Sequence, residues 1–313
     1  MAYDIVTIGA LLCEVMRKEL DKPLDKPADF TGPYPSGDTP IMINAAAKLG
    51  ANCAMIGTVG NDGFGKCVVD RLEENGVDCE MVSVHPSAST GVAFVCYFSD
   101  GSRNFLYHVH HAAPGMMTVD NINYELLEGA KWVHITGFTM SINEKSAEAV
   151  YDLMKKLPKS TKISFDPNIR PEALSVEQIK ELCFPVIERA SIIFPSKTEA
   201  AMFTGCTTDD EGCRLWAASG KIVVLKNGKT GSRVYFGQEI VDVASYEVEE
   251  IDPTGAGDTF CGAFLTALCE GKSYQDCAEF ANAAGAMSVR KLGPMEGAPD
   301  RSELDKFISK HRR

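Results

Sequence analysis

Short apolar segments alternate with amphipathic segments along almost the whole chain. The first such pair is the apolar run at residues 3–12 and the helical pattern at 40–50, and the second is the run at 53–60 with the amphipathic stretch at 65–76. Short apolar runs suit buried strands, whereas apolar positions three or four apart suit one face of a helix. Further strands are predicted at residues 131–136, 162–166, 191–194 and 221–225. A mostly parallel sheet covered by helices follows, which places the chain in the α/β class.

Two segments interrupt this rhythm. Residues 90–110 carry two alternating strand patterns around Asp100 and Gly101, a turn signal typical of a β-hairpin. Residues 12–36 carry four prolines with little helical periodicity, which predicts extended structure outside the main sheet. Together they are expected to form a small β-lid over the strand ends where open α/β folds bind ligands, within a single domain spanning 1–313. The alternative is that both are surface hairpins.

Composition narrows the classes of partner. The 313 residues are 45% hydrophobic, so the chain can bury a substantial core. Acidic residues outnumber basic ones by 43 to 31, which gives a net charge of -12 and argues against nucleic acid as a partner. No run approaches the roughly 18 apolar residues of a membrane span, so no membrane partner is expected. A small anion such as ATP can still bind, because local amides and Mg²⁺ decide that.

The eleven cysteines are scattered, with no CxxC pair. Their odd number, and the lack of an apolar signal segment after Met1, favour reduced thiols in the cytoplasm.

The segment with the most chemical information is EEIDPTGAGDTFCGAFLTALCEG, residues 249–271. It predicts a polar turn followed by a helix from about Ala256. Gly255 and Gly257 allow close approach of a ligand, and the amides of the first turn attract an anion. Asp258 beside this anion hole suits a general base acting on the acceptor, an effect of about 10²–10⁴ in rate. The alternative is a helix-start aspartate stabilised by the helix dipole.

Two short motifs resemble part of the P-loop of nucleotide-binding proteins but lack its first glycine. GKT at 228–230 and GKS at 271–273 are not P-loops, because Val223 and Thr266 stand where the first glycine of that loop is required. No GxGxxG follows the first strand, so a dinucleotide-binding fold has little support.

The run DPTGAGDTFCGAF resembles the C-terminal signature of the ribokinase family, also called the PfkB carbohydrate kinases. The resemblance continues through IVTIGALLCE, SGDTP, TVGNDGFGK, DPNIRPE, KNGKTGS and ANAAGAMSV. It implies a ribokinase-like three-layer sandwich with a β-lid, and an ATP-dependent sugar kinase with Asp258 as catalytic base. It also implies that the amides of Gly255, Ala256 and Gly257 hold the charge that develops on the transferred phosphate.

The same resemblance implies further site residues. Besides Asp258, those for the sugar are Glu14, Gly37, Asp38, Asn44, His108 and Arg170. Those for ATP are Asn168, Lys226, Gly228, Gly231 and Asn282. Glu199 corresponds to a residue linked to Mg²⁺ through water, and Asp252 and Thr254 resemble the monovalent-cation site, for K⁺, of some members. ATP and Mg²⁺ are therefore the implied cofactors, and a homodimer formed through the lid is a further expectation.

Three positions depart from the family or stay open. Ile41 stands where many relatives have asparagine, so one sugar hydrogen bond is lost or comes from Asn44 one helical turn on. Ser196 replaces the asparagine of the family's Asn-x-x-Glu motif. His108, which lies near His110 and His111, is open to three roles: hydroxyl recognition, metal binding, or an ordinary surface or core position.

Within the family, three segments are similar to tagatose-kinase-like proteins and, more distantly, to 2-keto-3-deoxygluconate kinases. They are FTGPYPSGDTP, NFLYHVHHAAPG and GPMEG. The latter place an arginine on the second lid hairpin, where His108 is expected here, so a neutral ketohexose or related sugar is favoured. A nucleoside kinase is the enzymatic alternative, with Phe94, Phe98 and Phe105 around the base. A sugar-binding regulator is the alternative outside enzymes, and would be expected to lose Asp258 or its glycines.

Overall fold

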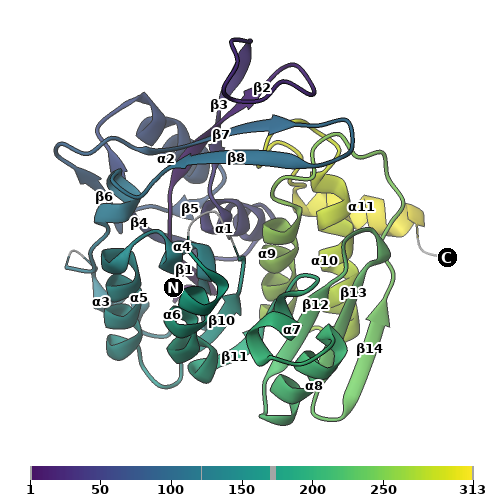
Figure 1. The fold of residues 1–313 in the computed structure, drawn as a ribbon. Helices are drawn as coiled ribbons and strands as arrows, with labels where there is room; N and C mark the ends of the chain where they lie inside the picture. The colour runs from purple at the N-terminus through teal and green to yellow at the C-terminus, as the bar shows by residue number, and fades with distance from the viewer. Residues whose placement is uncertain (1, 121, 170–173, 312–313) are drawn as a thin grey trace.

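The computed structural model describes residues 2–120, 122–169 and 174–311, and its centre is a ten-stranded sheet (Figure 1). The strand order is β14-β13-β12-β11-β10-β9-β1-β4-β5, with β6 also paired to β4. All pairs are parallel except the two that join β12, β13 and β14. The strands are β1 Ile5–Ile8, β4 Cys53–Gly60, β5 Val77–Asp78, β6 Val82–His85, β9 Trp132–Thr136, β10 Lys162–Asp166, β11 Ala190–Ile193, β12 Ile222–Lys226, β13 Ser232–Phe236 and β14 Glu239–Val243.

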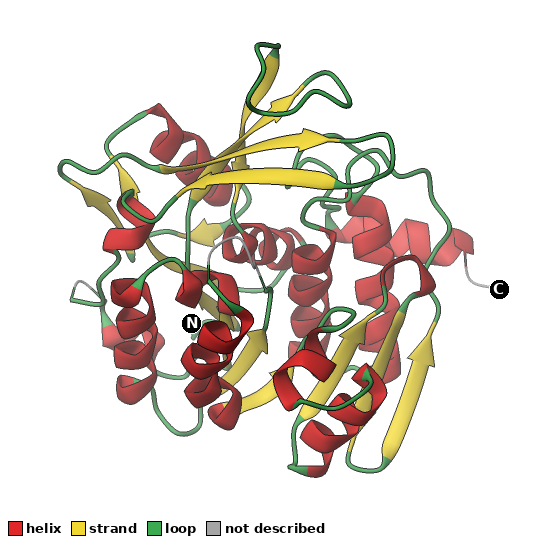
Figure 2. Cartoon of the chain, in the orientation of Figure 1, coloured by secondary structure: helices red, strands yellow, loops and turns green. Residues whose placement is uncertain are grey.

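Helices cover both faces of this sheet, as Figure 2 shows in red. One face carries α1 Asp38–Lys48, α2 Gly63–Glu74, α9 Ala256–Cys269, α10 Tyr274–Ser288 and α11 Arg301–His311. The other carries α3 Tyr124–Leu127, α4 Gly137–Ser141, α5 Glu144–Lys156, α6 Val176–Arg189, α7 Glu199–Thr204 and α8 Asp209–Ala218.

The alternating direction of side chains along each strand explains why the sheet has a hydrophobic core on each of its two faces. Val223 and Leu225 of β12 pack into one hydrophobic cluster, whereas Val224 between them packs into the other. Successive side chains of a strand point to opposite faces, so a continuous apolar run feeds both helix layers. The predicted three-layer sandwich with a mostly parallel sheet is confirmed.

A second sheet of four strands lies across the carboxyl ends of the parallel strands (Figure 1). It consists of β2 Leu12–Arg17, β3 Phe30–Ser36, β7 Gly91–Tyr97 and β8 Arg103–His108, in the order β3-β2-β7-β8. The β2–β7 pair is parallel and the other two pairs are antiparallel. We call this sheet the lid, and its strands fall within the two segments that interrupt the strand and helix rhythm.

The helices that border the lid start differently from most of the others. Side chains cap the first turns of α2, α5, α6, α8 and α10, and these capping residues are Asp62, Asn143, Ser175, Thr208 and Ser273. In contrast, α1 and α9 begin at the glycines Gly37 and Gly255, with no side-chain cap hydrogen bond. A helix start without a capping side chain leaves backbone N–H groups for another partner. Both of these starts face the lid.

The structure also bears on thiols and membranes. The eleven cysteines are free, and most of them are buried. In the described part of the chain, no helix has the length and apolar character needed to cross a membrane.

Candidate active site

A cavity of about 560 Å³ lies between the lid and the carboxyl ends of the parallel strands. Its walls come from β2 and β8 of the lid, from the first turns of α1 and α9, and from the loops after β10 and β11. Ten of the site residues proposed from the sequence line it: Glu14, Gly37, Asp38, Asn168, Glu199, Lys226, Thr254, Gly255, Gly257 and Asp258.

The start of α9 forms one wall. Gly255 has φ +79°, and a Cβ atom there would lie 2.6 Å from the carbonyl oxygen of Pro294, so the position needs glycine. Asp258 follows in the first turn and lines the same cavity. Ala256 does not line the cavity, and its N–H makes a long 3.4 Å contact with the Pro253 carbonyl. The result is a carboxylate and the positive end of a helix dipole within one cavity wall.

Lys226, at the end of β12, brings a positive charge to this wall. A Cβ atom on Gly257 would lie 3.5 Å from its Nζ, so the ammonium lies beside the first turn of α9. It forms a buried ion pair with Asp166, which also accepts a hydrogen bond from the Cys261 thiol at 3.4 Å. Burial alone would lower the pKa of Lys226, but the negative charges of Asp166 and Glu199 outweigh it and raise the pKa. Lys226 therefore stays charged.

Asp38 and Asn168 meet at the start of α1. Asp38 Oδ2 accepts a hydrogen bond from Asn168 Nδ2 at 2.8 Å, and Oδ1 accepts one from the Thr39 N–H at 2.8 Å. Gly37 has φ +110°, and a Cβ atom there would lie 2.1 Å from the Ala10 carbonyl oxygen. The structure thus places Asn168, proposed for ATP, next to the aspartate proposed for the sugar.

Glu199 joins two loops at the cavity. Its Oε1 accepts a hydrogen bond from the Ile169 N–H at 2.9 Å, and its Oε2 accepts one from the Ser196 N–H at 2.7 Å. Burial, followed by the charge of Asp166, raises the pKa of this carboxyl group. Glu199 therefore fixes the loops after β10 and β11, and its link to Mg²⁺ stays a prediction.

Glu14 projects from lid strand β2 and is 2% exposed. Its Oε2 accepts a hydrogen bond from the Ser36 hydroxyl at 3.3 Å, and its Oε1 has no hydrogen-bond partner among the described residues. Burial and then the nearby charge of Asp252 raise the pKa of Glu14 to about 8. At neutral pH the group is mostly protonated, so it can donate a hydrogen bond as well as accept one.

The lid is tied to the loop that precedes α9. The Tyr97 hydroxyl of β7 donates to Asp252 Oδ1 at 2.9 Å and lies 2.9 Å from the Thr254 hydroxyl. Arg103 of β8 donates to the same threonine oxygen at 3.1 Å. Asp252 also accepts hydrogen bonds at 2.9 Å from the N–H groups of Thr254 and Gly293. The loops proposed for a monovalent cation are therefore adjacent, and the cation itself stays a prediction.

Three residues proposed for ATP lie outside this cavity. Gly228 and Gly231 flank the turn after β12, and both have positive φ. A Cβ atom on Gly231 would lie 2.1 Å from the Val243 carbonyl, which also accepts a hydrogen bond from Asn282 Nδ2 at 3.1 Å. Gly231 and Asn282 thus lie close together at the end of β14. Lys226, which lines the cavity, is the last residue of β12 before this turn.

The sequence profile of the pfkB family carbohydrate kinases matches residues 3–301. The chain belongs to this family. Fructokinase-1 of Zea mays is 31% identical over 88% of each chain. The probable fructokinase-2 of Arabidopsis thaliana is 29% identical over 97% of this chain and 95% of its own. An Escherichia coli protein provisionally named ribokinase II, solved with ATP and Mg²⁺, has 35% identity and a TM-score of 0.93, covering 99% of this chain and 100% of its own.

As a member of the pfkB family, the chain is a sugar kinase, and two of its proposed sugar contacts need correction. His108 of β8 is exposed and stacks edge-on against Phe94, with ring centres 6.0 Å apart. The residues of β8 that line the cavity are Arg103, Phe105 and Tyr107. Strand alternation puts odd-numbered residues of β8 toward the cavity and His108 away from it. The sequence reasoning missed Arg103 and Tyr107, although this alternation was the signal that could have found them.

Asn44 is the second correction. It is buried in α1, and its Oδ1 accepts a hydrogen bond from Asn75 Nδ2 at 2.7 Å, away from the cavity. Ile41, one turn earlier, lines the cavity with an apolar side chain. The hydrogen bond that many pfkB kinases make from this helix is therefore not supplied by Asn44. Arg170, also proposed for the sugar, lies outside the described residues.

Proposed function

We propose that this kinase transfers the γ-phosphoryl group of ATP to a hydroxyl of a neutral ketohexose, with Asp258 as general base. The observation that carries the proposal is that Asp258 and the start of α9 share one cavity with the acidic residues Glu14 and Asp38. Carboxyl groups select hydroxyls by hydrogen bonding, and the helix start suits the transferred phosphate. The fructokinase relatives point to the same class of substrate.

In this mechanism Asp258 accepts the proton of the sugar hydroxyl as its oxygen attacks the γ-phosphorus, and the bond to the β-phosphate oxygen breaks. The amides at the start of α9 and the ammonium of Lys226 stabilise the negative charge on the transferred group. ATP and Mg²⁺ are the cofactors, and Mg²⁺ neutralises charge on the β and γ phosphates. Gly231 and Gly255 have positive φ, and a side chain there would meet the carbonyl oxygens of Val243 and Pro294, so both turns need glycine.

The charges in the cavity favour a neutral acceptor. Asp38 and Asp258 both line the cavity, so a substrate carboxylate would face two acidic side chains. Arg103 is the opposing observation, because its guanidinium enters the cavity from the second lid hairpin. An arginine can bind a carboxylate through two hydrogen bonds. A sugar acid such as 2-keto-3-deoxygluconate is therefore the second candidate.

The test is a coupled ADP-release screen with Mg-ATP over D-fructose, D-tagatose, aldohexoses, pentoses, 2-keto-3-deoxygluconate and nucleosides. We expect the highest kcat/KM on a ketohexose. A wild-type preference for the keto-deoxy acid would overturn the neutral-sugar proposal and leave the kinase assignment intact. Arg103→Met then separates the two, because it should abolish turnover of the acid but only weaken a neutral sugar.

We further propose that the lid pairs with the lid of a second copy, and that the enzyme works in the cytoplasm. The outer face of the lid carries the partly exposed rings of Phe30 and Phe94, which contact each other edge-on, and the exposed side chain of Leu106. An apolar patch of this kind marks an interaction surface. Light scattering of the wild type and of Leu106→Glu should show a dimer that becomes a monomer, and a wild-type monomer would refute the pairing.

A further inference from the structure

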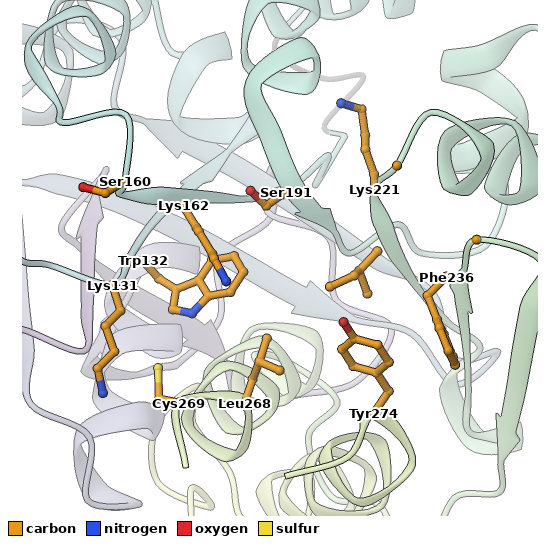
Figure 3. A pocket seen from close by; sticks show the side chains of 13 residues that line it. Lys131, Trp132, Ser160, Lys162, Ser191, Lys221, Phe236, Leu268, Cys269 and Tyr274 are labelled. Atoms are coloured by element: carbon orange, nitrogen blue, oxygen red, sulfur yellow. The ribbon is translucent and has the colours of Figure 1, made fainter. Parts of the chain in front are cut away.

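A second cavity, of about 770 Å³, lies at the amino ends of β9 to β12, at the opposite edge of the sheet from the lid. The last turn of α9 and the first turn of α10 complete its walls. We call it the amino-end cavity, and Figure 3 shows the side chains that line it.

The walls of the amino-end cavity are largely aromatic and aliphatic. The rings of Phe236 and Tyr274 contact each other with centres 4.8 Å apart, and Trp132 lies across the cavity from them (Figure 3). Leu268 and Ile222 add aliphatic surface to the lining. Apolar walls with a few polar groups are typical of sites for small organic ligands.

Two of the three lysines that line the cavity already have protein partners. Lys131 Nζ pairs with Asp4 Oδ1 at 2.7 Å. Lys221 Nζ donates to the carbonyl oxygens of Glu188 and Ala190, at 3.1 and 3.3 Å, where α6 ends. Both ammonium groups are therefore already in contact with protein oxygen atoms.

Lys162 differs from them. Its Nζ lies 5.3 Å from the centre of the Trp132 ring, and no carboxylate of the described residues lies within 4 Å of it. The Tyr274 hydroxyl points into the cavity in Figure 3, and neither it nor the Ser191 hydroxyl bonds to another described group. One ammonium and two hydroxyl groups thus belong to the lining of the same cavity as the aromatic rings. Together these groups can hold a phosphate or carboxylate.

We propose that the amino-end cavity binds a small aromatic anion, a planar ring that carries a phosphate or carboxylate group. The ring packs against the partly exposed rings of Phe236 and Tyr274, and the anionic group pairs with Lys162, whose Nζ lies over the Trp132 ring. The protein carries a net charge of -12, which repels anions from most of its surface, and Lys162 supplies a local positive charge that no carboxylate of the described residues neutralises within 4 Å. The site is separate from the kinase cavity and does not depend on which sugar is phosphorylated.

The chain has two tryptophans, so Trp216→Phe leaves Trp132 as the only tryptophan, whose emission can be followed. Phenyl phosphate is titrated into this variant with ADP and Mg²⁺ present to fill the kinase site. Inorganic phosphate and benzyl alcohol serve as the probes with charge alone and ring alone. We expect phenyl phosphate to change the fluorescence of Trp132 at a concentration at least about tenfold below either partial probe, because the two contacts add.

Lys162→Met should weaken phenyl phosphate binding about tenfold, as expected for loss of one charge-assisted hydrogen bond. Lys66→Met, which removes the same charge from exposed helix α2, should have no effect. Calorimetry on the otherwise native chain repeats the test if Trp216→Phe does not fold. Equal binding of benzyl alcohol, equal loss in Lys66→Met, or no response to millimolar phenyl phosphate would each overturn the proposal.

Discussion

The two ends of β12 carry lysines with opposite surroundings. Lys221, just before the strand, donates to the carbonyls at the end of α6, whereas Lys226, its last residue, pairs with Asp166 beside the uncapped start of α9. In a sheet of parallel strands joined by helices, helix carboxyl ends gather at one edge and helix amino ends at the other. The backbone therefore holds Lys221 at the amino end through carbonyl oxygens and offers N–H groups to an anion at the start of α9.

The larger of the two cavities is not the one whose groups suit phosphoryl transfer. The amino-end cavity is larger than the lid cavity, at about 770 against 560 Å³. Only the lid cavity combines a helix start that has no capping side chain, a buried cation and a carboxylate in the first helical turn. The comparison predicts that substitutions at the carboxyl end change turnover and that matched substitutions at the amino end do not.

The largest effect is expected for Asp258→Asn. Loss of a general base should lower kcat by about 10²–10⁴ while the KM for ATP changes little. The matched variant is Asp4→Asn at the amino end, where the carboxylate pairs with Lys131 and should not affect turnover. Steady-state kinetics on both variants provide the measurement. Unchanged kcat in Asp258→Asn would remove this residue from the mechanism.

The second prediction compares the two lysines of β12. Lys226→Met leaves the buried carboxylate of Asp166 without its partner, which should lower the free energy of unfolding by about 3–5 kcal/mol. Lys221→Met, which is only partly buried, should cost about 0.5–1 kcal/mol. Urea unfolding measures both.

The double variant Lys226→Met with Asp166→Asn sharpens this test. It removes both charges, so it should recover part of the stability and none of the activity. A Lys226→Met protein as stable as the wild type would contradict the buried ion pair.

Asp38→Ala tests the sugar side of the lid cavity. The sugar KM should rise about 10- to 100-fold, because hydroxyls and the Asn168 amide lose their acceptor, while the KM for ATP changes far less. Asp38→Asn keeps the size of the side chain and should restore part of the affinity. A rise of both KM values by the same factor would show a general structural defect instead.

Glu14 gives a pH dependence. Its pKa is about 8 in the folded chain and has an ordinary value of 4.5, so the folded state holds a proton between these values that the unfolded state has lost. Its contribution to stability is thus complete below pH 4.5 and is lost as the pH rises toward 8. Relative to Glu14→Gln, the wild type should lose about 1.4 kcal/mol of unfolding free energy per pH unit in this range. Parallel curves for the two proteins would contradict the raised pKa.

The smallest effect is expected for His108→Ala. This side chain faces away from the cavity, so both KM values should stay within twofold of the wild type, roughly the error of such assays. Arg103→Met on the inner face of the same strand should raise the sugar KM. A loss of sugar affinity in His108→Ala would restore it as a contact and reverse our assignment of the two faces of β8.

The amino-acid sequence alone predicted strands β1, β4, β9, β10, β11 and β12 and the two segments of the lid, but not the strands β5, β6, β13 and β14. Apolar runs buried on both faces form parallel strands, as in β10 and β12, and turn residues such as Asp100 and Gly101 mark the lid hairpin. These are local properties. The start of α9 at Ala256 could also be predicted from the sequence, because glycines next to a helical apolar pattern form a local signal.

Only the tertiary structure decided which side chains of these elements reach the cavity. A shift by one residue in a strand exchanges the two faces of that strand. In β8 the side chains of Arg103, Phe105 and Tyr107 line the cavity, and His108 does not. The tertiary structure likewise decided the contacts of Asn44, whose partner Asn75 lies 31 residues away in the sequence, and of Lys226, which meets Asp166 across 60 residues. The sequence determines elements through short-range periodicity, whereas contacts between elements depend on register and packing, which local patterns do not encode.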